Sequence, residues 1–255
     1  MNLKGKTILI TGGASGIGFE AAKQFLEIGT KVIVTGRNQD KLNDAKKRFP
    51  NLTVIKSDVS KAEDAKALFE KVSELGGIDI LYNNAGVGVP PMNLGIPNEK
   101  HIENAAYEME VNYLGVIRLN NLFLEMLNSK KDAAIINTTS ILSYVPSLTE
   151  ATYSATKTAL AFYTKSLREH LRIIKSNIKI FELLPPVVDT EMTAARTDKK
   201  ITPAELVKAL ISGLQKDQYT IRVGDSKIIY FLHRFFPKLA FGLVNPKNSE
   251  QSLKK

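Results

Sequence analysis

Three polar residues in the second half of the sequence could together exchange a proton with a substrate oxygen. Tyr153 and Lys157 stand four residues apart, so on a helix their side chains share one face. Ser140, thirteen residues before Tyr153, supplies a hydroxyl that could orient the same oxygen. Such a set suits the reduction of a carbonyl, which needs a hydride at carbon and a proton at oxygen. The alternative is a packed helix tyrosine and a serine that caps a strand end.

A glycine-rich turn near the beginning of the chain could hold the hydride carrier. The segment TGGASGIG at 11–18 follows the apolar run TILIT and precedes a predicted helix. Gly12, Gly16 and Gly18 allow a tight turn and a close approach to a pyrophosphate, which the helix N–H groups then stabilise. The spacing G-x-x-x-G-x-G differs from the commonest dinucleotide fingerprint, and a plain turn between strand and helix is the alternative.

The elements that must position these residues alternate between strand and helix. Apolar runs predict strands at 7–11, 31–36, 52–59, 78–86, 133–140 and 177–184, and helical spacing predicts helices at 19–29, 39–49, 61–75, 102–128 and 152–174. The strands are nearly continuous apolar runs, which is typical of a parallel sheet covered on both faces. We therefore expect an α/β fold with a doubly wound, Rossmann-type parallel sheet. No repeat or linker divides residues 1–255, which predicts a single domain.

Five motifs together resemble the short-chain dehydrogenase/reductase family. They are TGGASGIG, NNAG at 83–86, Asn112 in VNYLG, Ser140 in INTTS and YSATK at 153–157, in the family's order and spacing from about residue 6 to 190. The resemblance implies hydride transfer between a carbonyl and a secondary alcohol. It implies Tyr153 as general acid/base and Ser140 as the anchor of the substrate oxygen. It also implies that Lys157 adjusts the tyrosine pKa and contacts the nicotinamide ribose, while Asn112 holds a water in a relay to Lys157.

The resemblance also bears on the tyrosine pKa, on the oligomeric state and on the substrate. Lowering a tyrosine pKa from about 10 towards 7 needs about 4 kcal/mol, which Lys157 and a positive nicotinamide ring could supply together. The family often pairs its two long helices between subunits, so a homodimer or homotetramer is expected. The substrate is expected to be a small carbonyl or alcohol of unspecified structure. The alternative function is a cofactor-binding regulatory or sensor protein with little turnover, against which the intact Ser140, Tyr153 and Lys157 argue.

The segment VIVTGRN at 32–38 addresses the choice between NAD(H) and NADP(H). By the resemblance, Gly36 falls where an NAD-preferring relative carries an aspartate for the adenosine ribose. A glycine removes a carboxylate that would repel a 2′-phosphate, and Arg37 adds a planar, permanently charged partner for one. The sequence therefore predicts NADP(H) in preference to NAD(H).

Other strand ends carry further cofactor contacts by the same resemblance. Asp58 matches a carboxylate that meets the adenine amino group, although it would also suit the N-cap of the next helix. The NNAG turn passes the adenosine ribose and steadies the central sheet. The full set of predicted cofactor-binding residues is Gly12, Ser15, Gly16, Ile17, Gly18, Arg37, Asp58, Val59, Asn84, Ala85, Gly86, Tyr153, Lys157, Pro185, Val188 and Thr190.

The segment LPPVVDT departs from the family pattern. Pro186 occupies a slot where the family usually has glycine, so the loop is stiffer and lacks one N–H near the nicotinamide. Val188 and Thr190 remain placed to meet the carboxamide. By the same resemblance, residues from about 187 to 205 correspond to the family's substrate loop, which is expected to be mobile. Thr202, Pro203 and Glu205 form a capping box that predicts a new helix.

Composition excludes several other classes of function. The 255 residues contain no cysteine, which removes disulfides, thiolate metal sites and cysteine nucleophiles. The three histidines lie far apart, so no metal site is expected. Nothing indicates nucleic-acid binding, a signal peptide or an apolar run long enough to span a bilayer, and a cytoplasmic location is expected.

The net charge of +9 is concentrated near the end of the chain. Residues 216–255 contain eight Lys or Arg and three Asp or Glu, beside the apolar, aromatic segment KIIYFLHRFFPKLAFGLV. Such a segment could touch an anionic membrane surface. The sequence favours the other interpretation, a helix and strand that close the core with lysines facing solvent.

Overall fold

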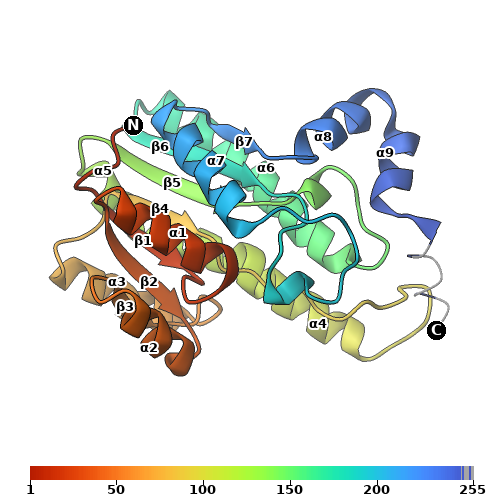
Figure 1. The fold of residues 1–255 in the computed structure, drawn as a ribbon, viewed down its shortest axis with the longest axis horizontal. Helices are drawn as coiled ribbons and strands as arrows, with labels where there is room; N and C mark the ends of the chain where they lie inside the picture. Colours follow the sequence, from red (N-terminus) through yellow and green to blue (C-terminus); the bar gives the residue numbers. More distant parts are fainter. Residues whose placement is uncertain (248, 250–252, 254–255) are drawn as a thin grey trace.

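The computed structural model describes residues 1–247, 249 and 253. Across this described part, the strands form one seven-stranded, fully parallel sheet in the order β3-β2-β1-β4-β5-β6-β7 (Figure 1). They are β1 (Thr7–Thr11), β2 (Lys31–Gly36), β3 (Thr53–Lys56), β4 (Ile80–Asn83), β5 (Ala133–Thr138), β6 (Ile178–Leu184) and β7 (Thr220–Arg222). The strand order reverses between β1 and β4, and sheets of this type bind ligands outside the carboxyl ends of the strands at such a switch point.

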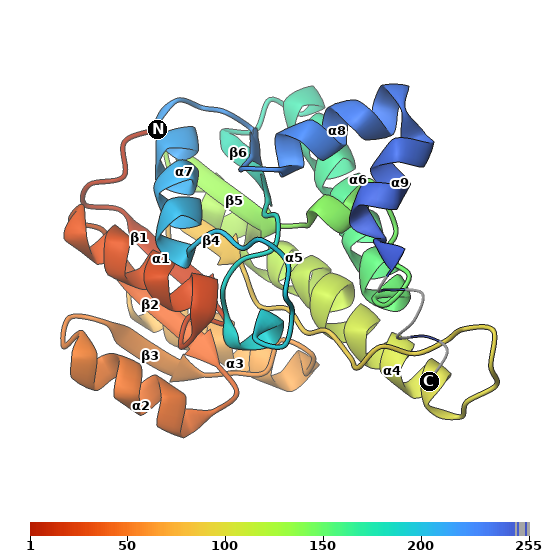
Figure 2. The same cartoon turned by 45° about the vertical axis from the view of Figure 1, so that its right-hand side comes forward.

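Apolar clusters on both faces of the sheet hold the helices against it. One face is covered by α1 (Gly16–Glu27), α2 (Gln39–Arg48) and α7 (Pro203–Gln215), which contribute Phe25, Leu42 and Leu210 to one cluster. The other face is covered by α3 (Ala62–Glu74), α5 (Gly115–Asn128) and α6 (Ala151–Ile173), which contribute Leu68, Phe123 and Leu171 (Figure 2). The predicted doubly wound parallel sheet of Rossmann type is therefore confirmed.

The helix predicted over 102–128 begins two residues earlier and changes pitch within its length. It consists of α4 (Lys100–Met109), a π-helical turn (Glu110–Leu114) and α5. Directly after this turn, a β carbon on Gly115 would lie only 2.8 Å from the carbonyl oxygen of Val59. Arg118 donates to the same oxygen at 2.8 Å, which draws the helix against the turn before α3. Asn112 thus lies in a π-helical turn, a feature frequent at functional sites.

The predicted capping box at the start of α7 is confirmed. The hydroxyl oxygen of Thr202 accepts from the Glu205 N–H at 3.2 Å, and the Glu205 carboxylate accepts from the Thr202 N–H at 2.8 Å. Pro203 occupies the first turn of the helix, where its missing N–H costs nothing.

The expectation that the C-terminal segment closes the core is only half right. β7 does complete the sheet, but the chain then forms a pair of helices, α8 (Ser226–Phe235) and α9 (Pro237–Val244), which lie outside the sheet against the segment that precedes α6 (Figures 1 and 2). The pair buries few side chains, among them Ile229 and Ala240, in a small separate cluster with Val145. Most of its large apolar side chains stay exposed. Among the described helices none is long and apolar enough to cross a bilayer.

Candidate active site

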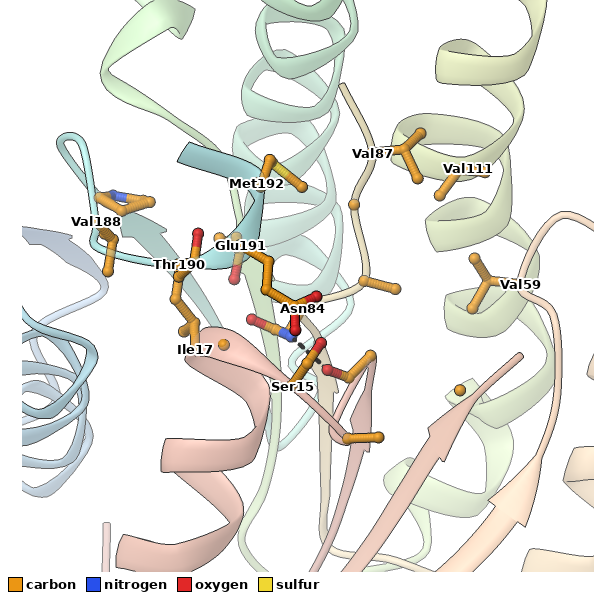
Figure 3. A pocket seen from close by; sticks show the side chains of 18 of the residues that line it. Ser15, Ile17, Val59, Asn84, Val87, Val111, Val188, Thr190, Glu191 and Met192 are labelled. Carbon is orange, nitrogen blue, oxygen red and sulfur yellow. Dashed lines mark hydrogen bonds between the residues drawn. The ribbon is translucent and has the colours of Figure 1, made fainter. Parts of the chain in front are cut away.

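A cleft of about 500 Å³ opens at the carboxyl ends of the central strands. In Figure 3, Ser15 and Ile17 at the start of α1 face Thr190, Glu191 and Met192 on the segment after β6, while Val59 and Val111 lie across the cleft. The structure brings together along this cleft nearly all the predicted residues: Gly12, Ser15, Gly16, Ile17, Arg37, Asp58, Val59, Asn84, Ala85, Gly86, Ser140, Tyr153, Lys157, Pro185, Val188 and Thr190. Gly18 and Asn112 stand just behind this lining.

The glycine turn has the backbone geometry that its sequence predicts. Gly12 and Gly16 have φ angles of +64° and +52°, in the left-handed region that favours glycine. A β carbon on Gly18 would lie 2.4 Å from the Gly12 carbonyl oxygen and 2.6 Å from the amide nitrogen of Asn84. The glycines therefore let the turn fold tightly over the N-terminus of α1, whose free N–H groups suit an anion.

The turn after β4 is fastened to the glycine turn by hydrogen bonds. The hydroxyl oxygen of Thr11 accepts from the N–H groups of Asn84 and Ala85, both at 3.0 Å. The Asn84 side chain donates to the Thr11 carbonyl oxygen at 3.0 Å. Asn84 thus uses its amide nitrogen inside the fold, as expected for a residue that steadies the sheet.

Lys157 reaches the cleft from α6 as a buried cation. Its Nζ donates to the carbonyl oxygen of Thr138 at 2.9 Å and lies 5.6 Å from the centroid of the Tyr153 ring. Burial lowers the pKa of Lys157 from 10.5 to about 8. Two further ammonium hydrogens remain for a ligand in the cleft.

The surroundings of the Tyr153 phenol within the protein raise its pKa, whereas the lowering expected from the sequence depends on Lys157 together with a positive nicotinamide ring. Burial raises its pKa first of all, and the negative charges of Glu150 and Glu108 raise it further. A hydrogen bond with Ser140 acts in the opposite direction. The positive charge of Arg196 also lowers the pKa of Tyr153, but desolvation of the phenolate dominates. The Ser140 oxygen also accepts from the Leu142 N–H at 3.1 Å, which fixes the hydroxyl at the end of β5.

Asn112 acts as a clamp between the turn after β4 and α6. Its side-chain oxygen accepts from the Val87 N–H at 2.9 Å, and its amide nitrogen donates to the Val87 carbonyl at 2.9 Å and to the Thr156 hydroxyl at 3.1 Å. Both amide hydrogens are therefore committed to the protein. In this arrangement the expected water relay cannot use the N–H groups of the Asn112 side chain.

Basic side chains gather where β2 meets α2. Arg37 borders the cleft and donates to the hydroxyl of Tyr107 on α4, whose ring centroid lies 5.8 Å from the guanidinium carbon. Lys41 on α2 also borders the cleft and forms an ion pair with Glu191 at 2.6 Å. Tyr107, Lys41 and Glu191 were not among the predicted residues, since these contacts join residues 70 and 150 positions apart.

Asp58 borders the cleft but is not the N-cap of α3. That position belongs to Lys61, three residues later. The Asp58 carboxylate instead accepts from the N–H and the hydroxyl of Ser60 at 3.0 and 2.7 Å, which closes a turn before the helix. The alternative of a helix cap at Asp58 is therefore wrong in position, because Val59, Ser60 and Lys61 lie between Asp58 and Ala62, the first residue of α3.

The segment after β6 lies along the cleft and is tied down on both sides. Val188 bridges to Ile201, and Thr190 lies so close to Gly16 that a β carbon there would be 3.2 Å from its methyl carbon. Beyond a short 3₁₀ turn (Glu191–Thr193), Arg196 forms an ion pair at 2.5 Å with Glu150, which precedes α6. The predicted substrate loop thus joins the Lys41 side of the cleft to the Tyr153 side.

Comparison with known proteins decides the family. Residues 6–201 match the short chain dehydrogenase family. The chain belongs to that family. It is 33% identical to an uncharacterized oxidoreductase of Bacillus subtilis (strain 168), DltE, over 87% of this chain and 89% of that protein.

Solved structures of this short chain dehydrogenase family have the same fold. One from Burkholderia cenocepacia J2315, in complex with NADP, superposes with a TM-score of 0.83 at 26% identity, over 96% of this chain and 99% of that one. A 3-ketoacyl-(acyl-carrier-protein) reductase from Brucella melitensis, complexed with NADH, superposes with a TM-score of 0.76 at 26% identity, over 84% and 92% of the two chains. The present chain is thus an oxidoreductase of a family whose members bind either nicotinamide cofactor.

Proposed function

We propose that this short chain dehydrogenase is an NADP(H)-dependent oxidoreductase that interconverts a carbonyl and a secondary alcohol. The observation that carries the proposal is the convergence of Ser140, Tyr153 and Lys157 on the cleft that begins at the glycine turn. The cofactor, when bound, supplies or accepts the hydride. The cleft fits such a group, since it combines a helix N-terminus for the pyrophosphate with basic side chains at its far end.

Each side chain of the site then has a separate task. The Tyr153 phenol donates its proton to the carbonyl oxygen during reduction and takes it back during oxidation. Ser140 donates its hydroxyl hydrogen to the same oxygen and holds it beside the phenol. Lys157 remains positively charged below a pKa of about 8, and its charge favours the phenolate as the proton leaves. Asn112 keeps the turn at Val87 and the start of α6 in fixed register.

The preference for NADP(H) is supported by the chemistry at the end of β2. Gly36 presents no carboxylate, and Arg37 is held towards the cleft by Tyr107. Four N–H groups of the guanidinium remain available for a 2′-phosphate. Lys41 adds a second cation. It leaves its ion pair with Glu191 and binds the 2′-phosphate instead.

Turnover and its dependence on the phenol test the reaction. NADPH oxidation is followed across a panel of ketones and aldehydes with the wild type, Tyr153→Phe and the control Tyr219→Phe, which changes a tyrosine remote from the cleft. We expect Tyr153→Phe to lose at least about a hundredfold in kcat while it retains cofactor affinity. Unchanged turnover in that variant would refute the mechanism. Tight NADPH binding without turnover on any carbonyl would instead favour a regulatory or sensor protein.

Cofactor dissociation constants test the preference separately. Arg37→Ala is expected to weaken NADPH by about 10- to 100-fold, the value of a charge-assisted bidentate contact, and to leave NADH nearly unchanged. Lys47→Ala removes an equal charge from the far side of α2 and serves as the control. An unaltered ratio of the two constants in Arg37→Ala would mean that Arg37 is only a surface residue.

A further inference from the structure

The helices α8 and α9 carry a cluster of phenylalanines that touch one another yet remain open to solvent. The ring centroid of Phe231 lies 4.9 Å from that of Phe235 and 6.5 Å from that of Phe236. The exposed fractions of the three residues are 54%, 58% and 54%. Ile228, Leu239, Phe241 and Leu243 on the same two helices are also exposed. We call these seven residues the α8–α9 surface. Large exposed apolar patches on a protein often mark a site that binds another protein or a membrane.

The charged residues within the α8–α9 segment from 226 to 249 have one sign. The segment contains Lys227, Arg234, Lys238 and Lys247 and no Asp or Glu. Four cations in the same segment as the exposed phenylalanines complement an anionic, amphipathic partner.

The helix pair is joined firmly to the body of the enzyme through its opposite side. Ile229 and Ala240 pack on Val145, and the Asn245 side chain accepts from the Leu148 N–H at 2.7 Å and donates to the Pro146 carbonyl at 2.9 Å. The α8–α9 surface is therefore directed away from these contacts. It cannot be folded back onto the core without breaking them.

We propose that the α8–α9 surface docks the protein onto an anionic lipid bilayer. The phenylalanine rings enter the interface between headgroups and acyl chains, while the four cations face lipid phosphates. Two helices of ten and eight residues lie in the interface and do not span it. A second copy of the chain is the poorer occupant, since a symmetric contact would set the four cations of one copy against those of the other without a carboxylate in the segment.

Flotation with lipid vesicles tests this docking directly. The full-length protein is mixed with vesicles of phosphatidylcholine, or of phosphatidylcholine with one third phosphatidylglycerol, at low and at physiological ionic strength. We expect binding to the anionic vesicles, weakened by salt. The variant F231S/F235S should reduce the partition coefficient about tenfold or more. The control L75S/I102S removes exposed apolar side chains elsewhere and should bind as the wild type does.

Charge variants and a fluorescent reporter separate the two contributions. K227Q/K238Q should weaken binding to anionic vesicles by about fivefold for each lysine, without an effect on neutral vesicles. Because the chain contains no tryptophan, Phe235→Trp gives a single reporter whose emission should shift to the blue with anionic vesicles. Phe162→Trp on α6 should not respond.

Four results would overturn the proposal. The first is no flotation with anionic vesicles at low salt, and the second is unchanged flotation of F231S/F235S. A third is a dimer, seen by sedimentation velocity, that F231S/F235S dissociates while no vesicle binding occurs, because this would identify a second copy as the occupant. The fourth is binding to polyglutamate as tight as to vesicles and independent of the phenylalanines, which would indicate an acidic protein. NADPH affinity, measured in every variant, verifies that each has folded.

Discussion

Thr11 and Thr35 stand opposite each other in the register of β1 and β2, and the same substitution should affect them in different ways. Both side chains are buried. The Thr11 hydroxyl accepts from the N–H groups of Asn84 and Ala85, each at 3.0 Å. The hydroxyl oxygen of Thr35 has no hydrogen-bond partner within the described residues. Valine replaces each hydroxyl by a methyl group of similar size, so the pair isolates what the hydroxyl contributes.

The structure gives the sign and the size of the two effects. Thr11→Val leaves the Ala85 N–H without an acceptor, whereas the Asn84 N–H keeps the Tyr82 carbonyl at 3.1 Å. We expect a loss of about 2–3 kcal/mol in the free energy of unfolding, since an orphaned donor costs about 1–3 kcal/mol. That loss lowers Tm by about 4–10 °C in a chain of this size. Thr35→Val removes a buried hydroxyl that has no hydrogen-bond partner among the described residues. The free energy of unfolding should therefore stay unchanged or rise by about 1 kcal/mol.

Urea unfolding followed by far-ultraviolet circular dichroism measures both variants without a bound cofactor. Thr11→Ser retains the hydroxyl and should recover most of the stability. A displaced turn at Ala85 would also disturb Gly12, which it contacts, so Thr11→Val should weaken NADPH binding severalfold. If Thr11→Val lies within about 0.5 kcal/mol of the wild type, or if both valine variants lose equal stability, the hydrogen-bond reasoning is refuted.

Three further predictions concern the cleft. Gly18→Ala should lower the free energy of unfolding by about 1–3 kcal/mol and weaken NADPH binding, because its β carbon meets the Gly12 backbone. The control Gly242→Ala, with open space around it, should be neutral or stabilising, and equal effects of the two substitutions would contradict this reasoning. Lys41→Met should weaken NADPH about two- to fivefold with NADH unchanged, as dissociation constants will reveal. Burial lowers the pKa of Lys157 in the folded protein to about 8. Above that pH the unfolded chain therefore binds one more proton at Lys157 than the folded chain does. The stability of the wild type relative to Lys157→Met should therefore rise by up to about 1.4 kcal/mol per pH unit between pH 8 and 10, and a flat difference in urea titrations would argue against a buried cation.

The sheet and the glycine turn could be predicted because their signals are local. A run such as TILIT must be buried on both faces, and helices between such runs lead to a parallel sheet. The positions of Gly12 and Gly16 follow from backbone conformations that other residues rarely adopt. The order of the strands then brings Ser140 and the start of α6 to the same edge of the sheet.

The parts that sequence could not supply depend on contacts between distant segments. Nothing near Arg37 in the sequence indicates that Tyr107 would hold it, and nothing near Lys41 indicates the ion pair with Glu191. The C-terminal segment was misjudged for a related reason. Its apolar residues have helical spacing that fits a core helix equally well, and only the position of β7 at the sheet edge leaves α8 and α9 without a core to cover.

Burial acts in opposite directions on the pKa values of the two central residues, yet it favours the neutral form of both. It raises the pKa of the Tyr153 phenol and lowers that of the Lys157 ammonium to about 8. At neutral pH the phenol therefore keeps its proton, while Lys157 still carries its charge. In the proposed reaction, a site in this state is prepared to give a proton to a carbonyl oxygen. For the reverse direction of the proposed reaction, removal of a proton from an alcohol requires more positive charge beside the phenol than the described side chains supply. In this proposal the direction of the reaction therefore depends on what the cleft binds.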